Sequence, residues 1–94
     1  MLLLPATLTA REARDTLRML TLAIEGQADA VVVVDASNLL QFDSAALSVL
    51  LECQRRALAL GKAFTLLEPP PKLTALAKLY GVDVLLMRSA SAPA

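Results

Sequence analysis

Two neighbouring polar residues, Asp43 and Ser44, stand between an aromatic residue and an apolar run in the segment FDSAALSVLL. A serine hydroxyl at such a place could act as a nucleophile or accept a phosphate group. Nucleophilic use requires a base, and the chain contains no histidine, the commonest base. Asp35 could join this pair at one end of a sheet, where α/β proteins often bind ligands, but no motif supports such a site. We therefore expect no catalytic residue and no enzymatic activity.

Metal and cofactor chemistry are equally unsupported by the residue types. The single cysteine, Cys53, cannot form an internal disulfide and has no neighbouring residues with metal-ligand spacing. The three glycines are isolated, so the chain has no glycine-rich phosphate loop. The sequence predicts no metal and no cofactor, and it favours a reducing compartment with Cys53 as a packed core residue.

Length and charge restrict the class of protein further. The chain has 94 residues, of which 56% are hydrophobic, and its nine basic and nine acidic residues cancel. This predicts one small domain over residues 1–87 and a flexible tail over residues 88–94. A neutral chain argues against nucleic acid and anionic membrane surfaces as main partners. No apolar run is long enough for a membrane span and no signal peptide is evident, so we expect a soluble cytoplasmic protein without direct membrane insertion.

The elements that must position Asp43 and Ser44 alternate between strands and helices. Thr9 and Glu12 form a capping box that begins a helix ending near Gly26, and Val31–Val34 reads as a strand covered on both faces. The remaining predicted elements are a strand over 2–4, a loop over 36–42, a helix over 44–60, a strand over 63–67, a helix over 72–80 and a last strand over 84–86. The sequence thus predicts an α/β fold: a mostly parallel sheet of about four strands packed against three helices.

The helix after Asp43 carries apolar residues on two sides. At 100° per residue, its core face comprises Ala46, Val49, Leu50, Cys53, Ala57 and Leu60. Leu47, Leu51 and Leu58 lie beside this face, together with Gln54, whose amide would be costly inside a core. Either a neighbouring helix covers these leucines, or they form with Ser44, Ser48 and Arg55 an apolar patch with a polar rim that binds another protein.

The two opening residues have roles that follow from helix chemistry. Asp43 is suited to be the N-cap, accepting backbone amides of the first turn. Ser44 would be the first helical residue, where the helix dipole would favour an added phosphate, although a small residue at that position is also simply tolerated.

The segment VVVVDASNLLQFDSAALSVLLECQRRALALGKAFTLLEPPPKLTALAKLYGVDVLL resembles the core of a STAS domain. The family's pattern is an apolar strand ending in Asp, a loop, and Asp-Ser or Asp-Thr opening a helix with Leu a few places on, matched here by Asp35, Asp43, Ser44 and Leu47. The closing LAKLYGV is most similar to the MlaB type, a STAS subunit of bacterial ABC transporters that move phospholipids between membranes. Two departures are Ala46, where the family often has glycine, and a shortened N-terminal strand pair that could leave an open sheet edge.

The resemblance implies a non-catalytic subunit, peripheral to the inner membrane, that binds the transporter's ATPase, with two copies of each per complex. The alternative within the family is an anti-sigma-factor antagonist whose binding to an anti-sigma factor is switched by a serine kinase acting on Ser44. In both cases partner contacts are implied near the start of the second helix. The candidate partner-binding residues are Asp43, Ser44, Leu47, Ser48, Leu51 and Arg55.

Overall fold

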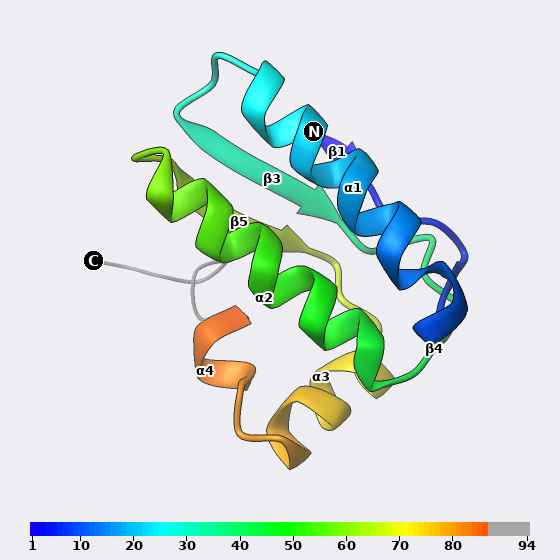
Figure 1. Ribbon diagram of the computed structural model, residues 1–94. Coiled ribbons are helices and arrows are strands. Elements are labelled where there is room, and N and C mark those ends of the chain that lie inside the picture. Colours follow the sequence, from blue (N-terminus) through cyan, green and yellow to red (C-terminus); the bar gives the residue numbers. More distant parts are fainter. Residues whose placement is uncertain (87–94) are drawn as a thin grey trace.

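A central parallel sheet is flanked by helices in the computed structural model, which describes residues 1–86 (Figure 1). This confirms the predicted α/β class. The strands are β1 (Leu2–Leu3), β2 (Thr7–Leu8), β3 (Val31–Asp35), β4 (Gln41–Phe42) and β5 (Ala63–Leu67). The helices are α1 (Ala10–Gly26), α2 (Ser44–Ala59), α3 (Pro71–Leu79) and α4 (Asp83–Leu86). The predicted flexible tail, residues 88–94, lies outside the described residues.

The main sheet has three parallel strands in the order β1–β3–β5, one fewer than the approximate number predicted. The edge strand β1 is short and pairs only with Val34 and Asp35 of β3. On that side the first part of β3 has no partner strand within residues 1–86, and the side-chain amide of Gln27 instead donates to the carbonyl oxygen of Val31.

Part of the segment 36–42, which was predicted to be a loop, forms the short strand β4. β4 pairs in parallel with β2, and each strand runs directly into a helix, β2 into α1 and β4 into α2. The pairing therefore brings the N-termini of α1 and α2 to the same end of the molecule (Figure 1).

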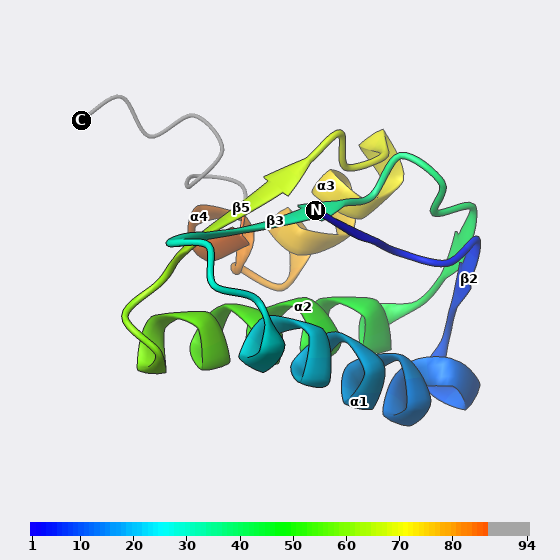
Figure 2. The same ribbon diagram turned by 90° about the horizontal axis from the view of Figure 1, so that it is seen from above.

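The prediction that Val31–Val34 is covered on both faces is wrong. Val32 and Val34 are fully buried, but Val31 is 44% exposed and Val33 is partly exposed. The reason is visible in Figure 2, where α1 and α2 lie side by side on the same face of the sheet. Alternate residues of β3 point towards that face, and the others point away from it.

The two long helices begin as the sequence predicts. The carboxylate of Glu12 accepts a hydrogen bond from the backbone amide of Thr9 at 2.8 Å, which closes the capping box of α1. The core face of α2 is buried as expected, including Cys53, and Leu20 and Ile24 of α1 are buried opposite it. Leu60 is an exception: it follows the last turn of α2, lies outside the core and is half exposed.

The last described element is a helix, which contradicts the strand predicted over 84–86. After Gly81, whose positive φ of 73° turns the chain, the amides of Leu85 and Leu86 both donate to the carbonyl oxygen of Val82. Leu86 is fully buried while Val84 and Leu85 are exposed, so the apolar residues follow a helical spacing and not the alternation of a strand. Within residues 1–86, no helix combines the length and apolar composition needed to cross a bilayer.

Candidate functional site

Asp43 is the N-cap of α2, as predicted, and it has a second role that the sequence did not reveal. Its Oδ1 atom accepts from the backbone amide of Ala45 at 2.8 Å. Its Oδ2 atom accepts from the amide of Ala10, the first residue of α1, at 3.2 Å. One carboxylate thus joins the first turns of both helices. Both oxygen atoms are engaged within the protein, so we expect Asp43 to shape the site more than to contact a partner.

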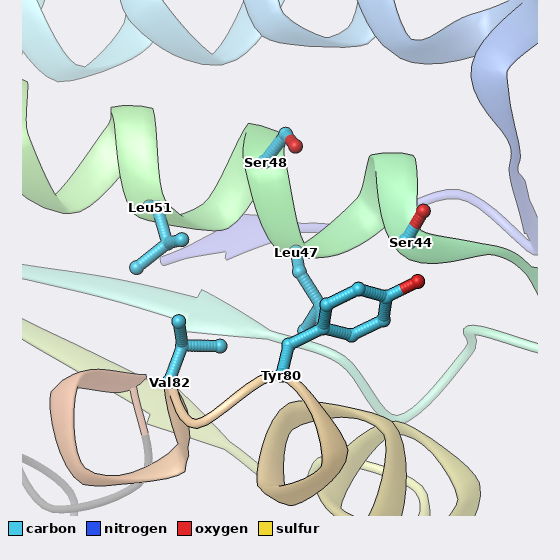
Figure 3. A pocket seen from close by; sticks show the side chains of 6 residues that line it. All are labelled: Ser44, Leu47, Ser48, Leu51, Tyr80 and Val82. Atoms are coloured by element: carbon cyan, nitrogen blue, oxygen red, sulfur yellow. The ribbon is translucent and has the colours of Figure 1, made fainter.

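A hollow of about 260 Å³ opens between α2 and the segment that joins α3 to α4 (Figure 3). It is lined by Ser44, Leu47, Ser48, Leu51, Tyr80 and Val82. Four of these six are among the predicted partner-binding residues, so the structure brings those four together. We call this space, defined by its six lining residues, the α2–α3 hollow.

The polar residues of the hollow are the two serines of α2. Ser44 and Ser48 are exposed and lie one turn apart on the helix. Figure 3 shows the ring of Tyr80 extending across the hollow with its hydroxyl end towards Ser44. No carboxylate, imidazole or amine lines the hollow, so Ser44 has no base there that could activate its hydroxyl.

Leu47 does not lie on an uncovered flank of the helix, and that part of the patch prediction is wrong. Its exposed fraction is 3%, and it belongs to the same buried cluster as Val49 and Leu50. The chain that follows α3 folds back beside α2, and Val82 packs against the core there. Leu47 is therefore the floor of the hollow, while the partly exposed Leu51 is its rim.

The other two members of the predicted margin behave differently from Leu47. Gln54 is half-buried and donates from Nε2 to the carbonyl oxygen of Leu85 at 2.6 Å, which ties α4 to α2. Leu58, one turn further along α2, is 61% exposed and does not line the hollow. The chain after α3 thus covers the margin of α2 near Leu47 and Gln54 and leaves it open near Leu58.

Arg55 lies outside the hollow and forms an ion pair along its own helix. Its guanidinium donates from Nε to Glu52 at 2.9 Å, and Arg56 binds the same carboxylate. These hydrogen bonds from Arg55 and Arg56 lower the pKa of Glu52 to about 2. The structure therefore separates Arg55 from the other predicted site residues.

Tyr80 and Val82 are the lining residues that sequence reasoning did not assign to the site. Tyr80 is the C-cap of α3 and is exposed. Three large apolar side chains close to it in sequence, Leu79, Val84 and Leu85, are also more than half exposed. This exposure depends on how the chain packs, so no signal in the sequence identified this part of the site.

The site offers no metal or thiol chemistry. No group of three or more His, Cys, Asp or Glu residues that could hold a metal ion occurs in residues 1–86. Cys53 is buried, and desolvation by this burial raises the pKa of its thiol to about 12, so the thiol stays protonated. Asp35 accepts the backbone amide of Ser37 at 2.8 Å and does not line the hollow. Hydrogen bonding to the side chain and the backbone of Ser37 lowers the pKa of Asp35. The arrangement is suited to binding.

Comparison with known proteins identifies one family. Residues 2–88 match the family model described as "Mlab, STAS domain". No curated protein matches the chain.

Proposed function

Because the chain belongs to the STAS domain family, in its MlaB branch, we propose that it is a non-catalytic subunit that binds the ATPase of an ABC transporter. This transporter moves phospholipids and so maintains the lipid asymmetry of an outer membrane. The protein would be cytoplasmic and would stay at the inner membrane only through its partner, with two copies of each subunit in the complex.

One structural observation carries the proposal: an apolar hollow with a hydroxyl rim lies beside exposed aliphatic and aromatic side chains. The hollow has an apolar floor at Leu47, and the exposed Tyr80 lines it. Leu79, the residue before Tyr80, is also exposed. Aromatic and aliphatic residues around a pocket are typical of the centre of a protein–protein interface, where one side chain of the partner can be desolvated. A site of this composition supports docking without any chemical step.

Docking would affect the transporter through differential affinity. A subunit that binds one arrangement of the ATPase more tightly than another increases the population of that arrangement. The α2–α3 hollow is built from two segments far apart in sequence; Asp43 caps the start of α2, and Gln54 ties α2 to α4. A preformed surface of this kind lowers the ordering cost of binding and so supports a stable assembly.

The test compares two leucines of α2 that differ in their relation to the hollow. Leu51→Arg places a charge on the rim of the hollow, and we expect it to weaken binding to the purified ATPase by about ten-fold or more. Leu58→Arg makes the same change on the same helix outside the hollow, at an exposed position, and should bind like the wild type. Binding is measured by calorimetry, and circular dichroism checks that both variants are folded.

Equal binding by wild type and Leu51→Arg would show that the hollow is not the docking surface. Loss of binding in both variants would show that the interface on α2 is not confined to the hollow. Failure of wild-type protein to bind the ATPase of its own operon at all would reject the transporter proposal.

The exposed position of Ser44 in the first turn of α2 favours a second candidate, an anti-sigma-factor antagonist. A kinase could reach this hydroxyl, and the added charge at the hollow would expel an apolar partner. Intact-mass measurement of protein isolated from its own cells separates the two: substantial phosphate on Ser44 supports the switch, while unmodified protein that co-purifies with the ATPase supports the transporter subunit.

A further inference from the structure

A second hollow lies on the other flank of α2, between α1 and α2. It measures about 260 Å³. Its lining residues are Arg14, Leu17, Arg18, Thr21 and Leu22 of α1 and Arg56 of α2. Figure 1 shows that α1 and the α3–α4 segment lie on opposite sides of α2, so this α1–α2 hollow is distinct from the site described above.

The rim of the α1–α2 hollow is basic and its base is apolar. Three of the six lining residues are arginines, and none is acidic. Arg14 and Arg18 are exposed and make no ion pair within residues 1–86. Leu17 packs against the core, while Leu22 is 64% exposed. Two unpaired guanidinium groups beside an exposed leucine leave both charge and apolar surface without a partner.

Arg56 contacts two carboxylates, one at a shorter distance than the other. Its Nε lies 2.9 Å from Oε2 of Glu52 on the same helix, and its Nη1 lies 3.6 Å from Oε2 of Glu25 on α1. The longer contact joins two groups that are 40% and 48% exposed, so it contributes little and can be exchanged. An incoming carboxylate could replace Glu25 while Glu52 keeps Arg56 oriented.

We propose that the α1–α2 hollow binds an acidic segment of a partner protein. One large apolar side chain of the segment would sit between Leu17 and Leu22, and its carboxylates would bind the guanidinium groups of Arg14 and Arg18. Arginine suits this role because its planar guanidinium binds carboxylates in a two-pronged geometry.

Charge and shape favour an acidic peptide over an anionic membrane. The whole chain has a formal net charge of zero, so no long-range attraction draws it to a charged bilayer. Asp15 and Glu25 are also exposed on α1 and would face the headgroups if that helix lay on a membrane. A short segment can meet the arginine rim and displace only Glu25 from Arg56, and the hollow is concave, as expected for receiving a side chain.

The test uses a fluorescent synthetic peptide in which glutamates flank a central pair of leucines, and a matched peptide with lysines in place of the glutamates. We expect saturable binding of the glutamate peptide only, with an affinity that falls as salt is added. Arg14→Glu combined with Arg18→Glu should weaken this binding by about ten-fold, because two attractions become repulsions. The control is Lys72→Glu combined with Lys78→Glu on α3, which changes the net charge equally and should bind normally.

Nuclear magnetic resonance of the labelled protein locates the peptide, and shifts confined to residues of the α1–α2 hollow support the proposal. Absence of saturable binding, equal binding of both peptides, or equal loss in both double variants would overturn it. Binding to phosphatidylglycerol vesicles that the Arg14/Arg18 variant loses, without peptide binding, would assign the surface to a membrane instead. The Arg14/Arg18 variant leaves the α2–α3 hollow intact, so its binding to the ATPase tests the proposed function separately.

Discussion

At the scale of single residues, Asp43 belongs to the family's sequence pattern, but both of its carboxylate oxygen atoms form hydrogen bonds within the fold. Its two oxygen atoms accept the amides of Ala45 and Ala10, which belong to different helices. Ser44, the next residue, is left exposed at the rim of the α2–α3 hollow. The two residues therefore have different roles: Asp43 caps the start of α2, and Ser44 exposes its hydroxyl to solvent.

Removal of this cap should destabilise the whole domain. We expect Asp43→Ala to lower the free energy of unfolding by about 1–2 kcal/mol, since the first turns of two helices lose an acceptor. Asp43→Asn should retain most of the stability, because its one remaining oxygen can still cap α2. Urea denaturation followed by circular dichroism measures both. Asp29→Ala, at an exposed residue before β3, is the control, and an equal loss there would contradict this role of Asp43.

At the scale of elements, α4 shows how a short helix completes the site. It has only four residues and would not be stable alone. Leu86 anchors it in the core, and the amide of Gln54 holds the carbonyl group of Leu85. Because Val82, just before α4, lines the α2–α3 hollow, the position of α4 controls the shape of that hollow.

Loss of the Gln54 hydrogen bond should loosen this helix locally. A typical hydrogen bond contributes about 1 kcal/mol, so we expect Gln54→Ala to speed hydrogen exchange at the amides of Leu85 and Leu86 by about five-fold. Exchange in β3 and α1 should change little. Gln41→Ala provides a control at an exposed glutamine whose side chain makes no hydrogen bond within residues 1–86. Unchanged exchange at α4 in the Gln54 variant would show that core packing alone positions this helix.

At the scale of the whole molecule, acidic side chains link stability to pH. Hydrogen bonds lower the pKa of Glu12 through Thr9, of Asp35 through Ser37, and of Glu52 through Arg55 and Arg56. A lowered pKa in the folded state means that the unfolded state binds protons more readily. The stabilisation from these groups is therefore present above the unfolded pKa values and is lost as pH falls through the folded ones.

We expect the urea midpoint to fall as pH is lowered from about 4.5 towards the Glu52 pKa of about 2. Glu52→Gln should reduce stability at neutral pH and flatten this decline, because the mutated residue no longer titrates. Glu68→Gln, at an exposed carboxylate in a turn without an ion pair within residues 1–86, should keep the wild-type slope. An identical slope in the Glu52 variant would show that its pairs with Arg55 and Arg56 contribute nothing to folding.

Features that depend on neighbours in sequence were predictable from the sequence by itself. The order of the main strands and helices, the capping box of Thr9 and Glu12, the cap at Asp43 and the burial of Cys53 all follow from local spacing. These contacts join residues within one or two turns, so residue type and helical period are enough to place them.

Features that depend on distant segments were decided only by the tertiary structure. Leu47, Leu51 and Leu58 look alike on the helical wheel, yet one is buried, one forms a rim and one is exposed. The difference arises because the chain after α3 returns along part of α2 and leaves the rest uncovered. The same return places α4 against α2 and Tyr80 at the hollow. Periodicity shows which residues share a face, but only packing decides what covers that face.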